Sequence, residues 1–110
     1  MTEAAVLIRL HVKSEFAEAF RAHTLELVRA ARNEPGCNSI QVLCKQEDPT
    51  QLVLLENWAD REYYLSEAHQ QSTHMQDYFE ATKLMIADVG VEMFAPVSEG
   101  APGRVHDDAT

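Results

Sequence analysis

The segment QLVLLENW, residues 51 to 58, decides the fold, because it is the most apolar strand candidate in the chain. Side chains alternate along an extended segment, and here both faces are largely apolar. A half-exposed strand would instead alternate apolar and polar residues, so we expect this strand to be covered on both sides. One face holds Leu52, Leu54, Glu56 and Trp58, and the other holds Val53, Leu55 and Asn57.

Three further strands and two long helices are predicted around this segment. Alternation predicts a first strand at 6–12, a second at 37–44 that forms a hairpin with 51–58, and a fourth at 91–97. Helical spacing predicts one long helix from Ser14, as N-cap, to residue 32. A second runs from a capping box at Thr73 to about residue 88, before Gly90. Between them lie a short helix at 60–68, capped by Asp60, and a break at 70–72.

The order β-α-β-β-α-β predicts an α+β, ferredoxin-like fold. Its simplest closed arrangement is a four-stranded antiparallel sheet with both long helices on one face. That arrangement leaves the other sheet face bare, although the strand at 51–58 is apolar on both sides. We therefore expect a homodimer in which two chains pack through their sheets. Residues 1–97 form the domain, and 98–110, rich in small and polar residues, are expected to be a mobile tail.

Length and charge restrict the partners. The chain has 110 residues, one domain's worth, and a formal net charge of −9 with only nine Lys and Arg. This charge argues against nucleic acid as a partner, which requires clustered basic residues. No apolar run approaches the ~20 residues that cross a bilayer, and no secretory leader is recognisable, so we expect no membrane association and a cytoplasmic location. Cys37 and Cys44 are too far apart along one strand to bond and are interpreted as buried thiols.

Two histidines are the main candidates for catalysis. His69 and His74 flank the predicted break, and imidazole exchanges protons near neutral pH. On one continuous helix a five-residue spacing would place them on different faces, so only the break allows them to meet in one pocket. The alternative is that one of them braces the helix junction. A metal site is not expected, because no third ligand has a recognisable spacing.

The candidate substrate-binding residues are spread over several elements. Glu56 lies on an apolar strand, so it is either paired with a basic neighbour such as Arg9 or is an acid with a raised pKa. Trp58 is expected mainly in the core. The tyrosines can serve packing or orient a phenolic ligand, and an inward-facing His23 is either a core residue or a pocket wall. The candidates in full are Arg9, His23, Glu56, Trp58 and Tyr78.

The turns at Pro35-Gly36 and Asp48-Pro49, the strand end Glu56-Asn57-Trp58 and the segment HQQSTH at 69–74 together resemble the antibiotic biosynthesis monooxygenase family over residues 5–97. The resemblance implies a dimeric α+β barrel and oxygenation of polycyclic phenols or quinols without metal, flavin or haem. The 69–74 segment is also similar to that of the isomerase branch that processes phosphorylated autoinducer-2. A haem-degrading branch uses an Asn on the first strand and a His on the last long helix; here the first strand offers Arg9 and His11 but no Asn, and positions 76–78 hold no His.

We therefore predict a dimeric monooxygenase without a cofactor, acting on a small aromatic or quinol-like substrate between helices and sheet. An isomerase or tautomerase that uses the same histidines, and a dimer that binds a metabolite without catalysis, remain alternatives.

Overall fold

The computed structural model of the protein describes residues 2–97, and the predicted tail at 98–110 lies outside this part of the chain. The elements follow in the order β1 (Ala4–Val12), a 3₁₀ turn (Ser14–Phe16), α1 (Ala17–Ala31), β2 (Cys37–Cys44), β3 (Gln51–Trp58), α2 (Arg61–Leu65), α3 (Glu67–Gln70), α4 (Thr73–Thr82) and β4 (Ile86–Phe94).

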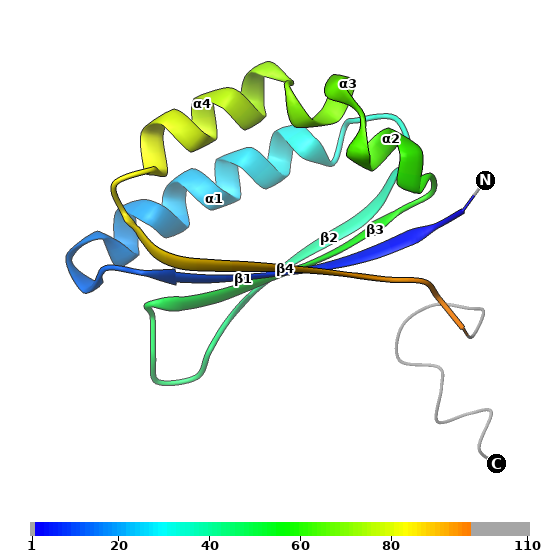
Figure 1. Ribbon diagram of the computed structural model, residues 1–110. Helices are drawn as coiled ribbons and strands as arrows, with labels where there is room; N and C mark the ends of the chain where they lie inside the picture. Colours follow the sequence, from blue (N-terminus) through cyan, green and yellow to red (C-terminus); the bar gives the residue numbers. More distant parts are fainter. Residues whose placement is uncertain (1, 98–110) are drawn as a thin grey trace, which may run out of the picture.

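The four strands form one antiparallel sheet in the order β2-β3-β1-β4. This is the predicted ferredoxin-like arrangement, with the apolar strand β3 inside the sheet between β1 and β2. All helices lie on one face of the sheet, with α1 and α4 side by side and α2 and α3 above one end (Figure 1).

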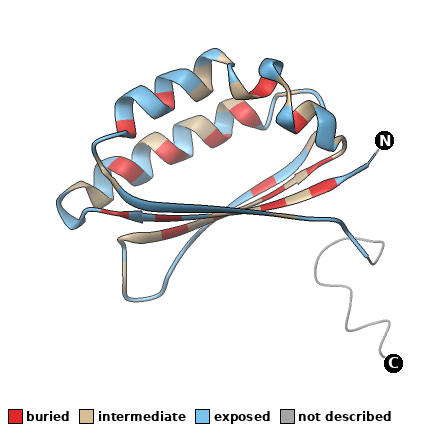
Figure 2. Cartoon of the chain, viewed as in Figure 1, coloured by how far each residue is buried: buried red, intermediate tan, exposed pale blue. Residues whose placement is uncertain are grey.

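The core lies between the helices and the inner sheet face. The buried bands of α1 and α4 face the sheet (Figure 2), and Phe20 and Val28 of α1 are almost completely buried. Each strand contributes to the core the side chains that point towards the helices, which are every second residue along the strand. Their buried apolar side chains are Ala4, Val6, Leu10, Val12, Ile40, Leu52, Leu54 and Trp58.

The outer sheet face is not covered by this chain. On β3, the inner residues are buried, whereas Val53, Leu55 and Asn57 are only half-buried. The expectation that both faces of β3 are covered therefore holds for one face within a single chain. Strand β4 is exposed along most of its length, and Val89 and Val91 keep more than half of their surface in solvent.

The end of the second long helix differs from the prediction. Helix α4 ends at Thr82, and Ile86 already belongs to β4 and pairs with Val12. Gly90 does not stop a helix but lies inside β4, opposite Arg9. The apolar stripe from residue 75 to 86 thus mixes a helix with the start of a strand, because pairing with β1 outweighs local helical spacing.

Two of the three predicted caps are wrong. Asp60 accepts a hydrogen bond from the backbone N–H of Glu62, as expected. Ser14 instead begins the 3₁₀ turn, and no side chain caps this turn. Helix α4 does begin at Thr73, but the residue before it is Ser72, whose side chain binds elsewhere.

The two cysteines are free and do not pair with each other, as predicted, but they are not buried. Cys37 is half-buried and Cys44 is exposed. Among residues 2–97, no helix is long and apolar enough to cross a membrane.

Candidate functional site

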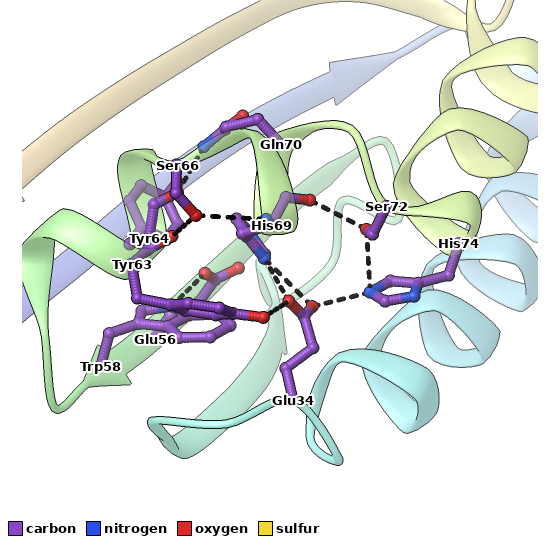
Figure 3. Close-up of polar contacts among 10 residues, drawn as sticks. All are labelled: Glu34, Glu56, Trp58, Tyr63, Tyr64, Ser66, His69, Gln70, Ser72 and His74. Carbon is purple, nitrogen blue, oxygen red and sulfur yellow. Dashed lines mark hydrogen bonds and ion pairs between the residues drawn. The ribbon is translucent and has the colours of Figure 1, made fainter.

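One carboxylate joins the two histidines. Oε1 of Glu34 lies 2.8 Å from Nδ1 of His69, and Oε2 lies 2.7 Å from Nε2 of His74. The hydroxyl of Tyr63 donates to Oε1 at 2.8 Å. Figure 3 shows the three side chains converging on Glu34 from α2, α3 and α4. The Glu34 and His69 side chains are more than nine-tenths buried, whereas His74 keeps about a quarter of its surface in solvent.

The chain is broken twice to allow this convergence. Ser66 separates α2 from α3 in an extended conformation, and its hydroxyl caps α3 by accepting from the N–H of His69. The second break is the one predicted at 70–72, and in the structure it lies at Gln71 and Ser72, after α3 ends at Gln70. The Ser72 hydroxyl donates to the carbonyl of His69 at 2.8 Å and lies 3.2 Å from Nε2 of His74. Through its hydroxyl, Ser72 thus contacts both His69 and His74.

The hydrogen bonds determine the charge of Glu34. Burial would raise the pKa of this carboxyl, but the hydrogen bonds from the two histidines and the tyrosine outweigh burial and lower it. Glu34 is therefore ionised at neutral pH and can only accept hydrogen bonds. Consequently the facing ring nitrogens must carry the protons, Nδ1 in His69 and Nε2 in His74.

This assignment leaves Nε2 of His69 as the basic nitrogen. Within residues 2–97, Nε2 of His69 has no hydrogen-bond partner. Every fully buried polar side-chain atom in this part of the chain does have a partner, so Nε2 is not fully buried. Nε2 must therefore be open to the cavity that His69 lines. The ring lies among aromatic side chains, with its centroid 4.6 Å from that of Trp58 and 5.0 Å from that of Tyr64.

The cavity itself is apolar, with a volume of about 340 Å³, and lies between the helices and the inner sheet face. This volume is at the lower end of the range for small-molecule sites. Its polar lining includes Glu56, His69, Gln70 and Thr82, and Lys83 is the single cation among the side chains that line it in the described part of the chain. Its apolar wall includes Ile8, Leu10, Leu27, Leu54, Met75, Phe79, Val89 and Val91.

Glu56 also faces this cavity. Its Oε1 accepts a hydrogen bond from Nε1 of Trp58 at 2.9 Å. Burial raises the pKa of Glu56, and the indole hydrogen bond and the charge of His69 offset only part of this effect. Of the two sequence interpretations of Glu56, the structure therefore supports the acid with a raised pKa.

The predicted pairing of Glu56 with Arg9 is wrong. Arg9 lies on the opposite, outer face of the sheet, where its guanidinium pairs with Glu92 of the neighbouring strand. The two side chains cannot meet, because alternation along β1 points Arg9 away from the helices. Arg9 accordingly does not line the main cavity.

The two remaining candidates occupy different places. The Tyr78 hydroxyl lies 2.8 Å from the hydroxyl of Thr24 and so ties α4 to α1, although the ring lines the main cavity. His23 does not reach that cavity. Together with His74 it lines a separate surface groove between α1 and α4. His69 and His74 therefore both contact Glu34, but His69 lines the main cavity and His74 lines the surface groove between α1 and α4.

Sequence reasoning missed Glu34. Glu34 lies in the turn that ends α1, directly before Pro35, about 35 residues before His69 in the chain. A carboxylate next to a turn is not informative by itself. The available signal was topological, since the α1–β2 turn and the β3–α4 connection lie at the same end of a ferredoxin-like sheet (Figure 1).

In residues 2–97, no three His, Cys, Asp or Glu side chains are arranged to hold a metal ion. His69 and His74 are instead each hydrogen-bonded to Glu34.

Comparisons with known proteins agree with this architecture. The family model for antibiotic biosynthesis monooxygenases matches residues 4–81. Mycobacterium tuberculosis Rv0793 has 25% identity and a TM-score of 0.81, over 91% of this chain and all of that one. Pseudomonas aeruginosa PA3566 has 20% identity and a TM-score of 0.81, over 89% of this chain and 97% of that one. A protein described as an antibiotic biosynthesis monooxygenase has 24% identity and a TM-score of 0.78, over 86% and 99% of the respective chains.

No curated protein matched the sequence. The solved structures establish the fold, and the family model covers more than half of the chain. The protein therefore belongs to the antibiotic biosynthesis monooxygenase family.

Proposed function

We propose that the protein is a monooxygenase of the quinol monooxygenase type, which oxidises an electron-rich phenol or quinol without a cofactor. The observation that carries the proposal is the buried His69, whose Nδ1 is held by an ionised Glu34 while its Nε2 opens into an apolar cavity. An imidazole base that faces an apolar cavity is suited to removing the proton of a phenolic hydroxyl. The family resemblance supports chemistry that needs no metal, flavin or haem.

The first step is proton transfer. Nε2 of His69 takes the phenolic proton, and the carboxylate of Glu34 stabilises the imidazolium that forms. The phenolate carries electron density at its ring carbons, and one electron passes from it to dioxygen. The substrate radical and superoxide then join in a new carbon–oxygen bond, and His69 returns its proton to give a hydroperoxide.

The second step regenerates the base. His69 removes the hydrogen from the oxygenated carbon, the O–O bond breaks, and the carbon becomes a carbonyl. The released hydroxide takes the proton from His69 and leaves as water. In sum, one phenol and one dioxygen give one quinone and one water, and the substrate loses four electrons. The apolar cavity excludes bulk water from the anion and radical during this sequence.

The lining indicates the class of substrate. His69 and Glu56 lie near each other in the lining, and most of the remaining wall is aliphatic or aromatic. This arrangement suits a flat apolar molecule with its hydroxyl at one edge. A phosphorylated substrate requires clustered cations or N–H donors, and in residues 2–97 Lys83 alone supplies a positive side chain to the lining.

The proposal is tested by oxygen consumption with a panel of hydroquinones and naphthols, in buffer containing a metal chelator. We expect turnover above the spontaneous rate, and a loss of about 10²- to 10⁴-fold in kcat for His69→Gln. Glu18→Gln, an exposed carboxylate of α1 away from the cavity and the outer sheet face, is the control and should leave turnover unchanged. Turnover at the spontaneous rate, or turnover that requires added metal, contradicts the proposal.

A second candidate is an isomerase or tautomerase, related to the autoinducer-2 branch. It is favoured by one observation, that Glu56 and His69 both line the cavity and can act as acid and base. Such an enzyme moves a proton between carbon and oxygen and consumes no dioxygen. Equal conversion of an enolisable carbonyl compound with and without air supports it over the monooxygenase.

The proposal includes a homodimer in the cytoplasm. The outer sheet face carries half-buried Leu7, Val53 and Leu55, with the exposed ring of Phe94 beside them, and a second copy would cover this surface. A reducing compartment suits the free thiols of Cys37 and Cys44.

A further inference from the structure

We propose that Glu34 is the positioning residue for His69, and that His74 acts through Glu34 and not on the substrate. This inference rests on the proposed function of His69 as the base. It separates two histidines that look equivalent in the sequence and gives each its own role.

The role of Glu34 in positioning His69 is inferred from its contacts. Its two oxygens receive three side chains, with Tyr63 and His69 on Oε1 and His74 on Oε2, and His69 is also 3.0 Å from Oε2. A carboxylate held at both oxygens cannot rotate away from the imidazole. The ring of His69 is therefore fixed in orientation as well as in tautomer.

Fixing the tautomer matters because only one tautomer is a base towards the cavity. With the proton on Nδ1, the lone pair of Nε2 faces the substrate. With the proton on Nε2, the ring presents an N–H and cannot accept the phenolic proton. Glu34 thus decides which fraction of the protein is competent for the first step, although it does not line the cavity.

The inference that His74 acts through Glu34 rests on where His74 lies. Nε2 of His74 is occupied by Glu34 and lies next to Ser72, and the ring lines the groove between α1 and α4. His74 is absent from the lining of the main cavity, which includes His69. It therefore touches no substrate bound there. Its N–H restrains the far oxygen of Glu34, so its effect on the reaction passes through the carboxylate.

Nitrogen NMR of protein with ¹⁵N-labelled histidine tests the tautomers without any substrate. In the wild type at neutral pH, we expect His69 to carry its proton on Nδ1 and His74 to carry it on Nε2. Glu34→Leu removes the acceptor, so His69 should lose its exclusive Nδ1–H form. Retention of that form in Glu34→Leu overturns the inference, whether or not the protein turns over any phenol.

Glu34→Gln makes a sharper prediction, because an amide offers one acceptor and one donor. The hydroxyl of Tyr63 and Nδ1–H of His69 both require an acceptor on the same side, so the amide oxygen should face them. The amide NH₂ then faces His74, whose proton should move to Nδ1. If Glu34→Leu does not fold, this variant decides, and an unchanged His74 tautomer overturns the inference.

Kinetics separate positioning from catalysis. We expect Glu34→Leu to lower kcat by about 10²- to 10⁴-fold with KM nearly unchanged, since the substrate contacts are intact. His74→Leu should lower kcat by about 10- to 100-fold, whereas His74→Gln, which keeps a donor for Glu34, should lose less than about tenfold. Glu18→Gln, an exposed carboxylate of α1, is the control.

The decisive comparison is between the two histidines. A loss in His74→Gln as large as that in His69→Gln would show that His74 itself transfers protons, and the assignment would be wrong. If no phenol is turned over by the wild type, the proposed function fails, while the tautomer measurements still decide the role of Glu34.

Discussion

Removing the hydroxyl of Tyr78 should cost stability and leave catalysis nearly intact. Tyr78 lines the cavity, which makes it a natural substrate contact, but its hydroxyl is already bonded to Thr24 at 2.8 Å. Thr24 is completely buried and Tyr78 nearly so. The bond joins α1 to α4, which lie side by side over the sheet (Figure 1) and both contribute side chains to the cavity lining. One hydrogen-bonding position of this hydroxyl is therefore already taken by Thr24, and we expect its main role to be structural.

The expected cost follows from the burial of the pair. A neutral hydrogen bond contributes about 0.5–1.5 kcal/mol, and leaving a buried partner unsatisfied adds to this loss. Thr24 lies inside a helix, where its hydroxyl can turn to a backbone carbonyl four residues earlier and recover part of the loss. We therefore expect Tyr78→Phe to lower the free energy of unfolding by about 1–2 kcal/mol. In a domain of this size, each kcal/mol corresponds to roughly 4–8 °C in Tm.

Urea unfolding of the single variants Tyr78→Phe and Thr24→Val and of the double variant measures the pair directly. The coupling energy should be about 1 kcal/mol, because the double variant removes both partners together. Protein concentration must be the same throughout, since association shifts apparent stability. Steady-state kinetics on the same samples should show kcat and KM within about threefold of the wild type, less than 1 kcal/mol of transition-state stabilisation.

Two results would refute this reasoning. A coupling energy near zero would mean that the hydroxyl pair does not bind the helices together. A large rise in KM with unchanged stability would mean that the Tyr78 hydroxyl contacts substrate, as the sequence interpretation allowed.

Three further predictions concern single positions. Glu56→Gln should stabilise the protein at neutral pH and have no effect well below pH 4, because the raised folded-state pKa of Glu56 makes the wild type lose stability as pH rises; urea unfolding at both pH values checks the sign. Gly36→Ala should cost about 1 kcal/mol, measured by thermal unfolding, since Gly36 has a φ of 82° and a new Cβ would meet no atom within 4 Å, so that strain alone acts. Leu55→Glu on the outer sheet face should convert the proposed dimer to a folded monomer, and an unchanged mass in light scattering would count against the dimer.

The sequence predicted the fold because its strands carry clear two-residue alternation. Strand β3 was placed at 51–58 with its faces correctly divided, and strand β2 was bounded correctly at 37–44. The junction of α4 and β4 was not predictable in the same way. The helical spacing up to residue 86 favours a longer helix, but residues 86–94 pair with β1, a partner about 80 residues earlier in the chain.

The candidate site was only half predictable. The break near Ser72 correctly predicted that His69 and His74 come close together, but they share Glu34 and line different cavities instead of one pocket. Their shared partner Glu34 could not be found from local pattern, since hydrogen bonds that span 35 and 40 residues leave no periodic trace. Arg9 failed as a partner for Glu56 for the opposite reason, because strand alternation alone already assigns it to the outer face.

The broken connection between β3 and α4 also has a consequence for folding. Its two short helices, of five and four residues, are far below the length at which a helix is stable alone in water. They persist through the tilted aromatic contacts of Tyr63, Tyr64 and His69 with Trp58 and through the hydrogen bonds to Glu34. Segment 61–70 is thus expected to open at lower free energy than the sheet, and its amides should exchange hydrogen before those of β1 and β3. Proton-transfer geometry is then the last property acquired on folding and the first lost in mild denaturant.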